Sequence, residues 1–460
     1  MRTYFSRLLP VLFLALLIFA GCAMPGTVTQ ETDPPILQTL PAETAPPETQ
    51  PPETEPAIPE IIIPEAITED AFATILVSGD IMSHLPLVNA GFTGSEYRYD
   101  KFFRYIAPYA QDADFAVANL ETTFAGTENG DKYSGFPRFN CPDSMADALK
   151  AAGYDMLLTA NNHTYDTRVY GLDRTLEVLS EKEILSLGTT ATEEEPNYRI
   201  VEINGIRVGM ICYTYGEIDE ATGQKSVNGL PMNLALKDRI NVFDYEKKSL
   251  FYTQMAQDLQ NLQSDGAEFT VLFIHWGNEY RTYSNTHQQE IAQKMCDLGI
   301  DVIIGGHPHV IQPAELLTSR EDPDRHTLCV YSVGNFLSNQ HAGNMDLTTG
   351  HTEDGVLFRF RLVKYSNGQV HLDSADFIPT WVCIRNTDGS RSYDILPLDT
   401  AISDWKKEFS LSSGDFSDAQ RSYQRTMEIL GTSMASVCEE LDGIRTLRER
   451  SFRIFRGGVG

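Results

Sequence analysis

The stretch Val302-Ile303-Ile304-Gly305-Gly306-His307-Pro308-His309 joins a run of β-branched residues directly to a polar turn. The β-branched run favours a buried strand. The two glycines let the backbone approach its neighbours closely, and the proline stiffens the turn between the two imidazoles. The stretch therefore predicts a strand whose C-terminal end presents two histidines to one cavity.

The same order, an apolar run followed by polar residues, recurs at five other predicted strands. The polar groups that follow these strands are Ser78-Gly79-Asp80, Asn119-Leu120-Glu121, Asn161-Asn162-His163, His275-Trp276-Gly277 and Gly334-Asn335-Phe336. In open α/β sheets, ligand sites form outside the carboxyl ends of the strands. We therefore expect these polar side chains to converge on one sheet edge.

Amphipathic segments separate the apolar runs and predict an α/β fold. The expected strands cover residues 73–77, 115–118, 156–158, 208–212, 270–274, 302–304 and 328–331, and the expected helices cover 144–152, 171–182, 250–264 and 286–298. Strands that alternate with helices imply much parallel pairing. Residues 356–364 and 369–377 flank an Asn-Gly turn and predict a hairpin, so the sheet should become mixed toward its end.

The residue types at the predicted edge are those of a metal centre. Carboxylates, imidazoles and an amide oxygen suit divalent zinc, manganese or iron. Five or six candidate ligands without a thiol favour two ions over a closed structural zinc site. Five other histidines do not follow a predicted strand and are set aside, namely His287, His326, His341, His351 and His371.

The first 22 residues have the features of a targeting signal. Arg2 and Arg7 precede an apolar segment, residues 8–20, that is too short for a comfortable membrane span. Phe19-Ala20-Gly21-Cys22 resembles a lipobox, so residues 1–22 are interpreted as a lipoprotein signal peptide and Cys22 as the lipidated residue. An ordinary secretory signal or an uncleaved anchor is the alternative. We expect the protein at the cell membrane, lipid-anchored on its extracytoplasmic face.

Residues 23–70 are predicted to form a disordered tether rich in Pro, Glu and Thr. They hold 11 of the chain's 23 prolines and no Lys or Arg, a composition that favours an extended spacer. The folded domain is expected at 71–385, with a mainly helical C-terminal extension at 386–460. The six cysteines after Cys22 show no close pairing, so buried thiols are expected rather than a disulfide framework.

The charge of the chain argues against nucleic acid as a partner. The net charge is −28, from 36 Lys and Arg against 64 Asp and Glu. Binding to a phosphate backbone requires clustered cations. A small anionic substrate is not excluded, because a bound metal would supply local positive charge.

Six motifs, in this order, resemble those of the CapA family of poly-gamma-glutamate and capsule synthesis proteins. They are Gly79-Asp80-Ile81-Met82, Asn119-Leu120-Glu121, Asn161-Asn162-His163, His275-Trp276-Gly277-Asn278-Glu279-Tyr280, Gly306-His307-Pro308-His309 and Gly334-Asn335-Phe336. That family in turn resembles the calcineurin-like metallophosphatases. The resemblance implies a two-sheet β-sandwich flanked by helices, with a site for two divalent metal ions.

The resemblance also implies roles for individual residues. The implied metal ligands are Asp80, Glu121, Asn162, His275, His307 and His309. His163 would be the catalytic residue that faces substrate. The residues expected to orient the ligands are Asn161, Glu279, Glu315 and Asn335.

Two positions depart from the metallophosphatase pattern. Met82 stands where a histidine is usual, and His84 is the candidate replacement ligand. Glu121 stands in place of a bridging aspartate and adds a methylene group. Both departures weaken the expectation of phosphatase chemistry more than that of metal binding.

The resemblance implies a role in making, exporting or anchoring a capsule polymer such as poly-gamma-glutamate. At the site we expect metal-dependent hydrolysis or transfer, at a phosphate ester or at an amide. One alternative is a surface metallophosphoesterase that acts on nucleotides or phosphorylated glycans. Another is a non-enzymatic polymer-binding assembly subunit with a vestigial site. The expected partners are the membrane, through Cys22, the capsule polymer and membrane synthase subunits.

Overall fold

The computed structural model describes residues 67–345, 349–387 and 390–457. The predicted signal peptide, Cys22 and all but the last few residues of the predicted tether lie outside the described residues. All described residues belong to one compact unit. None of the helices in these ranges combines the length and the apolar character needed to cross a bilayer.

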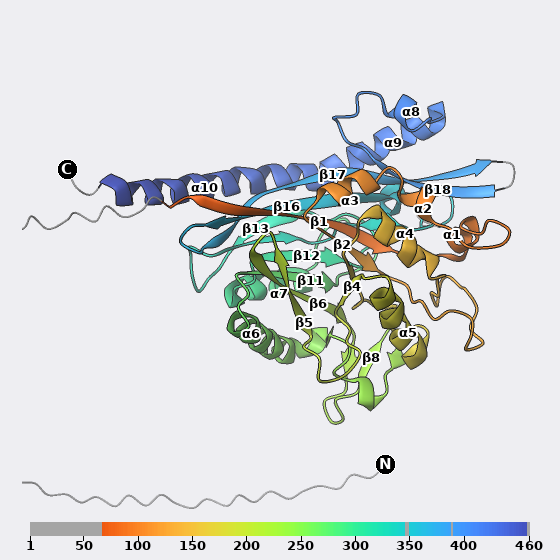
Figure 1. Cartoon of the computed structure of the whole chain (residues 1–460), viewed down its shortest axis with the longest axis horizontal. Helices are drawn as coiled ribbons and strands as arrows, with labels where there is room; N and C mark the ends of the chain where they lie inside the picture. The colour runs from red at the N-terminus through yellow and green to blue at the C-terminus, as the bar shows by residue number, and fades with distance from the viewer. Residues whose placement is uncertain (1–66, 346–348, 388–389, 458–460) are drawn as a thin grey trace, which may run out of the picture. The chain divides into compact units, whose positions relative to one another are not determined.

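Two large mixed sheets form the centre of this unit (Figure 1). The first sheet has the order β18 (Ser390–Pro397), β17 (Val370–Thr387), β16 (Asp354–Tyr365), β1 (Glu69–Ile81), β2 (Phe115–Leu120), β3 (Met156–Leu158) and β4 (Leu185–Leu187), and β15 (Asn335–Leu337) also pairs with β1. The second has the order β10 (Val242–Phe243), β6 (Ile206–Tyr215), β11 (Phe269–His275), β12 (Val302–Gly306), β14 (His326–Val330) and β13 (Ala314–Thr318), and β5 (Tyr198–Ile203) pairs with β6. A small third sheet contains β7 (Glu217–Ile218), β8 (Lys225–Val227) and β9 (Leu230–Pro231).

Helices cover the outer faces of both large sheets, and the last helix instead packs against the core between them. The helices are α1 (Leu85–Ala90), α2 (Asp100–Phe103), α3 (Ala107–Asp112), α4 (Ser144–Ala152), α5 (Arg168–Glu181), α6 (Lys248–Ser264), α7 (Thr286–Leu298), α8 (Trp405–Glu408), α9 (Ser413–Thr426) and α10 (Thr432–Gly457). A π-helical turn, η4 (Met427–Gly431), joins α9 to α10, and short 3₁₀ turns occur at η1 (Leu234–Leu236), η2 (Tyr245–Lys247) and η3 (Gly350–Glu353).

Alternation along the strands divides the apolar side chains between three cores. In β1, Ile75 and Val77 point into the core between the sheets, whereas Leu76 packs under the helices that cover the first sheet. In β11, Phe273 joins the same inter-sheet core, and Leu272 faces α6 and α7. Burial of each such side chain stabilises the fold by roughly 1.5–3 kcal/mol. The two-sheet sandwich expected from the family resemblance is therefore confirmed.

The predicted elements are present and most are longer than expected. Strand β3, helix α4 and helix α7 have the predicted bounds. Strands β1 to β4 pair in parallel, as do β6, β11, β12 and β14. The predicted hairpin is β16–β17, which pairs antiparallel around the Asn-Gly turn, where Gly368 has a φ of 83°. The six cysteines within the described ranges are free, and five of them are buried.

The C-terminal residues are mainly helical, as predicted, but they are integral to the sandwich. The expected boundary at 385/386 falls inside β17, which continues to Thr387 and pairs with β18. Strand β18 was not predicted because its first residues, Ser390 to Ser392, are polar and it lies at a sheet edge. Further on, Leu430 and Met434 enter the inter-sheet core.

A buried ion pair fixes α9 to the first sheet. Nε and Nη2 of Arg425 each donate to one carboxylate oxygen of Asp354, at 2.6 Å, and Nη2 also donates to the Gly350 carbonyl. The Asp354 side chain is 2% exposed and Arg425 is 20% exposed. A buried carboxylate deprived of its partner is strongly destabilising.

Arg425→Ala is therefore expected to lower the free energy of unfolding by about 3 kcal/mol. Arg421→Ala is the matched control, because Arg421 lies on the same helix and pairs with the partly exposed Asp418. That change should cost less than about 1 kcal/mol. Urea denaturation followed by circular dichroism measures both values. Similar losses in the two variants would show that the buried pair does not anchor α9.

Candidate metal centre

The structure brings the six predicted ligands together where strand ends of both sheets meet. Asp80 is the penultimate residue of β1, Glu121 follows β2, and Asn162 lies in the turn after β3. From the second sheet, His275 ends β11, and His307 and His309 follow β12. All six side chains are buried. Convergence of strand ends from two sheets places a concentrated set of polar groups inside an otherwise apolar sandwich.

Glu121 is at the centre of the set. It is 0% exposed, and neither of its carboxylate oxygens has a hydrogen-bond partner. Three imidazole nitrogens surround Oε1: Nε2 of His275 at 3.5 Å, Nε2 of His309 at 3.8 Å and Nε2 of His163 at 4.0 Å. A buried carboxylate without donors costs free energy unless positive charge lies beside it. This side chain is therefore built to contact a cation.

Asp80 is held from both sheets. Asn119 Nδ2 donates to its Oδ1 at 2.7 Å, and the His307 backbone N–H donates to its Oδ2 at 3.3 Å. His309 Nδ1 lies 3.1 Å from the same Oδ2. Burial alone would raise the pKa of Asp80, but the hydrogen bond with His309 and the charges of His275 and His309 bring it below its ordinary value. Asp80 is therefore ionised.

The two histidines after β12 have opposite electrostatic surroundings. Burial, reinforced by the charges of neighbouring imidazoles, lowers the pKa of His307 well below its ordinary value, and its Nδ1 has no hydrogen-bond partner. Burial also disfavours charge on His309, but Glu121 and Asp80 outweigh it and raise the pKa of His309 to about 9. His307 thus offers a free lone pair, and His309 holds a proton that a bound cation would displace.

The backbone of this turn is strained. His307 has a φ of 93° and His309 a φ of 57°. Both values lie in the left-handed region, which residues other than glycine rarely adopt. There is no room for a side chain at Gly305, where a Cβ would lie 2.0 Å from the Tyr331 carbonyl oxygen. Such strain persists where the surrounding structure imposes it, commonly at functional sites.

The turn after β3 contributes His163 and its partner Asp166. Nδ1 of His163 lies 2.8 Å from Oδ2 of Asp166, which also accepts a hydrogen bond from the Phe139 N–H at 2.7 Å. The Phe139 ring packs edge-on against the imidazole at 4.6 Å. Asp166 therefore fixes the imidazole with Nε2 directed at Glu121.

Of the four residues expected to orient the ligands, two lie in or directly beside the candidate metal centre. Asn161 lies in the site, where its Nδ2 donates to Asn119 Oδ1 and to the Leu120 carbonyl. Asn335 pairs in register with Asp80, and its Oδ1 is buried without a partner. Asn335 Nδ2 donates to Ser338, Gln340 and the Thr352 carbonyl, and the orienting role of both residues stays a prediction.

Three other candidates stand apart from the ligand cluster. His84 Nδ1 contacts the Met82 carbonyl and the Asn339 N–H at 3.3 Å each, and burial lowers its pKa to about 4. Glu279 is exposed after β11 and acts on His309 only through its charge. Glu315 is exposed on β13, where it accepts a hydrogen bond from Tyr331. The structure does not bring Glu315 to the site, because β13 is an antiparallel edge strand of the second sheet.

The donor atoms fit divalent metal ions. Glu121, His307 and His309 form one group of ligating atoms within 4.8 Å of one another, and Asp80, Glu121 and His275 form a second such group. Mixed carboxylate and imidazole donors suit first-row divalent metals. The unpartnered oxygens of Glu121 and the free Nδ1 of His307 are the atoms that such an ion would satisfy. The geometry therefore indicates divalent metal binding.

The structure places in the site three residues whose roles were not predicted from the sequence. Asn119 links Asn161 to Asp80, and Asp166 fixes His163. Asn119 belongs to a quoted motif, and the three-residue spacing from His163 to Asp166 within one turn was a usable signal. Tyr215, whose ring centre lies 4.7 Å from that of His307, carries no such signal because it ends an ordinary apolar strand.

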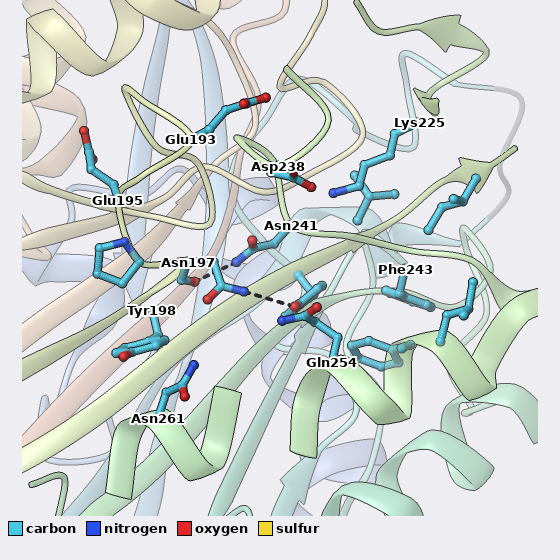
Figure 2. Close-up of a pocket in the computed structure, with 16 residues that line it drawn as sticks. Glu193, Glu195, Asn197, Tyr198, Lys225, Asp238, Asn241, Phe243, Gln254 and Asn261 are labelled. Carbon is cyan, nitrogen blue, oxygen red and sulfur yellow. Dashed lines mark hydrogen bonds between the residues drawn. The ribbon is translucent and has the colours of Figure 1, made fainter. Parts of the chain in front are cut away.

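A separate pocket of about 430 Å³ lies away from these ligands, beside α6 and β6. Figure 2 shows that its polar groups bond to one another: Asn241 donates to the Asn197 carbonyl, and Asn197 donates to the Tyr213 hydroxyl. None of the six predicted ligands lines this pocket. We therefore assign no part of the candidate metal centre to it.

A two-sheet α/β sandwich with Asp, Glu, Asn and His side chains at its strand ends defines a metallophosphatase-like protein. The sequence model of the family described as bacterial capsule synthesis protein PGA_cap matches residues 74–340. That match covers more than half of the 460 residues, and the chain belongs to this family.

Two proteins similar in sequence to this chain are named for capsule or PGA biosynthesis. The capsule biosynthesis protein CapA of Bacillus anthracis is 27% identical over 314 residues, which are 66% of this chain and 67% of that protein. The PGA biosynthesis protein CapA of Bacillus subtilis (strain 168) is 24% identical over 280 residues, which are 60% of this chain and 65% of that protein. The matches thus span about two thirds of each relative. The crystal structure of TT1561 of Thermus thermophilus has a TM-score of 0.30 and 10% identity, covering 57% of this chain and 89% of that one.

Removal of the central carboxylate charge should abolish metal binding without unfolding the protein. We expect Glu121→Gln to bind less than about a tenth of the manganese or zinc bound by the wild type and to lose the metal-induced rise in Tm, because both candidate groups share Glu121. Glu315→Gln is the matched control and should keep both properties. Elemental analysis and thermal melts with and without EDTA measure them. Full metal content in Glu121→Gln would refute the central position of this carboxylate.

Proposed function

We propose that this chain acts in capsule-polymer biosynthesis as a metal-dependent hydrolase or transferase, lipid-anchored through Cys22 on the extracytoplasmic face. The observation that carries the catalytic part is the buried Glu121 carboxylate, unpartnered and surrounded by three imidazoles. Family membership supports the biological part. We propose poly-gamma-glutamate or a similar polymer as the material handled, with membrane synthase subunits as partners.

The proposed metal content is two divalent ions of manganese, zinc or iron, and Glu121 would contribute to both positions. His307 and His309 would complete one position, and Asp80 and His275 the other. Asn162 would assist the second position, since its Oδ1 lies 2.8 Å from His275 Nε2. When bound, such ions polarise the reacting group and activate water for attack.

His163 is the proposed proton carrier. Asp166 holds its Nδ1, so Nε2 is the atom that faces the interior of the site and can give a proton to a leaving group. Asn119 and Asn161 keep Asp80 in place through their hydrogen bonds. The buried ring of Phe139 packs against His163, and the half-buried ring of Tyr215 packs against His307, so both rings limit the access of bulk water.

His163→Gln should lower the rate of metal-dependent cleavage about 10²- to 10⁴-fold while metal content stays at the wild-type level. The assay is hydrolysis of an aryl phosphate and of a glutamyl amide by the full chain with added manganese. His326→Gln, on β14 beside Thr318, is the matched control and should keep the wild-type rate. A wild-type rate in His163→Gln would remove this residue from the mechanism.

The biological role is tested in cells that lack the gene for this chain. Wild-type protein should restore the surface polymer, whereas His307→Ala should not. The polymer is measured by extraction and acid hydrolysis, and immunoblotting checks that both proteins accumulate equally. Full restoration by His307→Ala would favour the non-enzymatic assembly subunit. If cells with His307→Ala make normal polymer but lack phosphoesterase activity toward nucleotides or phosphorylated glycans, the surface phosphoesterase is favoured.

A further inference from the structure

A cavity of about 630 Å³ adjoins the candidate metal centre and shares Asp166 with it. Its walls are residues 129–138, the start of α5 and Leu85. The arm 129–138 closes against α1 at Gly135, where a Cβ would lie 2.3 Å from the Leu85 backbone nitrogen. Asp166 contacts His163 on one side and lines this cavity on the other. A ligand in the cavity would therefore lie beside the proposed proton carrier.

Besides the carboxylates of Asp131 and Asp166, three cations line the cavity in a chain whose net charge is −28. They are Lys132, Arg138 and Arg168, all exposed or partly exposed. Within the described ranges none of them forms an ion pair; Arg168 lies only near the Tyr165 ring, at 5.7 Å. Cations that line a cavity and lack a carboxylate partner are available to an anionic ligand.

The N-terminus of α5 adds to this positive potential. Helix α5 has 14 residues, no acidic residue in its first turn and no side-chain hydrogen bond from Thr167 at its N-cap. The Arg168 N–H donates to the Tyr165 carbonyl, and the positive end of the helix dipole favours an anion here. Arg168, the first residue of the helix, has a φ of 63°, a strained conformation that the surrounding turn imposes.

One buried atom in the wall requires a hydrogen-bond donor. Asp166 is 2% exposed, and its Oδ2 is satisfied by Phe139 and His163. Its Oδ1 is buried and has no partner among the described residues. Three cations alone would accept a simple anion, whereas a ligand whose N–H or O–H group reaches this oxygen would also satisfy the buried acceptor.

Exposed apolar side chains complete the wall. Phe136 is 74% exposed, Leu85 46% and Tyr170 40%. Methylene groups of a flexible ligand can pack on such surfaces while its charged ends reach the cations. The ligand that satisfies all of these groups is acidic, carries N–H donors and has an aliphatic part.

We propose that this cavity is a binding subsite for a strand of an acidic polyamide. Carboxylates of the strand bind Lys132, Arg138, Arg168 and the N-terminus of α5, and an amide N–H donates to Asp166 Oδ1. The strand is thereby held with its next amide beside His163. The inference rests on the proposed function for the reaction, but the binding itself does not require the metal centre.

The test is fluorescence anisotropy of a labelled poly-gamma-glutamate oligomer with the full chain. The variant Lys132→Ala/Arg138→Ala/Arg168→Ala should raise the Kd about 10- to 100-fold and flatten its dependence on salt. The matched control Lys101→Ala/Lys406→Ala/Lys407→Ala removes the same charge from exposed helix positions and should change the Kd less than about twofold. Equal losses in the two variants would overturn the subsite, because they would show an effect of net charge alone.

Two further measurements keep the test decisive. Arg138→Glu alone should weaken binding more than Arg138→Ala, which guards against a folding defect in the triple variant. Alginate, which has carboxylates but no amide, should bind at least about tenfold more weakly than poly-gamma-glutamate, because it lacks the N–H donor. Equal affinity for alginate would show that the ligand is an anionic glycan and would overturn the polyamide proposal.

A metal-site variant separates this inference from the proposed function. His309→Ala should lose metal and keep wild-type affinity for the oligomer, whereas the triple alanine variant should keep metal and lose affinity. If wild-type protein binds the oligomer at this cavity but holds no metal, the proposed function fails and the subsite stands. If metal is present and the triple variant binds normally, the subsite alone fails.

Discussion

The burial of Glu121 is the constraint on which the rest of the site depends. Its two carboxylate oxygens are enclosed by the ends of both sheets and receive no hydrogen bond. An ionised carboxylate in such a place destabilises the fold by several kcal/mol unless a counter-charge is present. The protonated His309 partly supplies that charge in the free protein, at 3.8 Å. The fold thus encloses a carboxylate whose oxygens lack hydrogen-bond donors, and a divalent ion would satisfy them.

Much of the fold was predictable because its central strands are apolar and its helices have clear start and stop signals. Helix α7 begins after an Asn285 capping box and ends at Gly299 in the left-handed conformation, so its bounds agree with the sequence. Edge strands gave weaker signals. Strand β18 begins with three consecutive polar residues, and β13 is an antiparallel strand at a sheet edge, so tertiary pairing rather than local sequence determines them.

The convergence of the candidate ligands was predictable because parallel strands deliver their C-terminal residues to one place. Asp80, Glu121 and His275 lie next to strand ends and meet in space as that rule requires. The rule fails for Glu315, because the antiparallel edge strand β13 places it away from that edge. The rule also makes no prediction for Asp166, because the role of Asp166 depends on a side-chain contact within a turn.

The hydrogen bonds of the buried polar groups distinguish structural from functional ones. Asp354 is as deeply buried as Asp80, yet both of its oxygens accept from Arg425, so it needs no ligand. Around the metal centre, Asn119 and Asn161 are paired in the same way. At the site, the unpaired atoms are instead on Glu121, His307, Asn335 and Asp166, residues that the family resemblance or the geometry places at the chemistry. Because buried polar groups are normally satisfied, atoms left open at one place mark where a cation and an N–H donor belong.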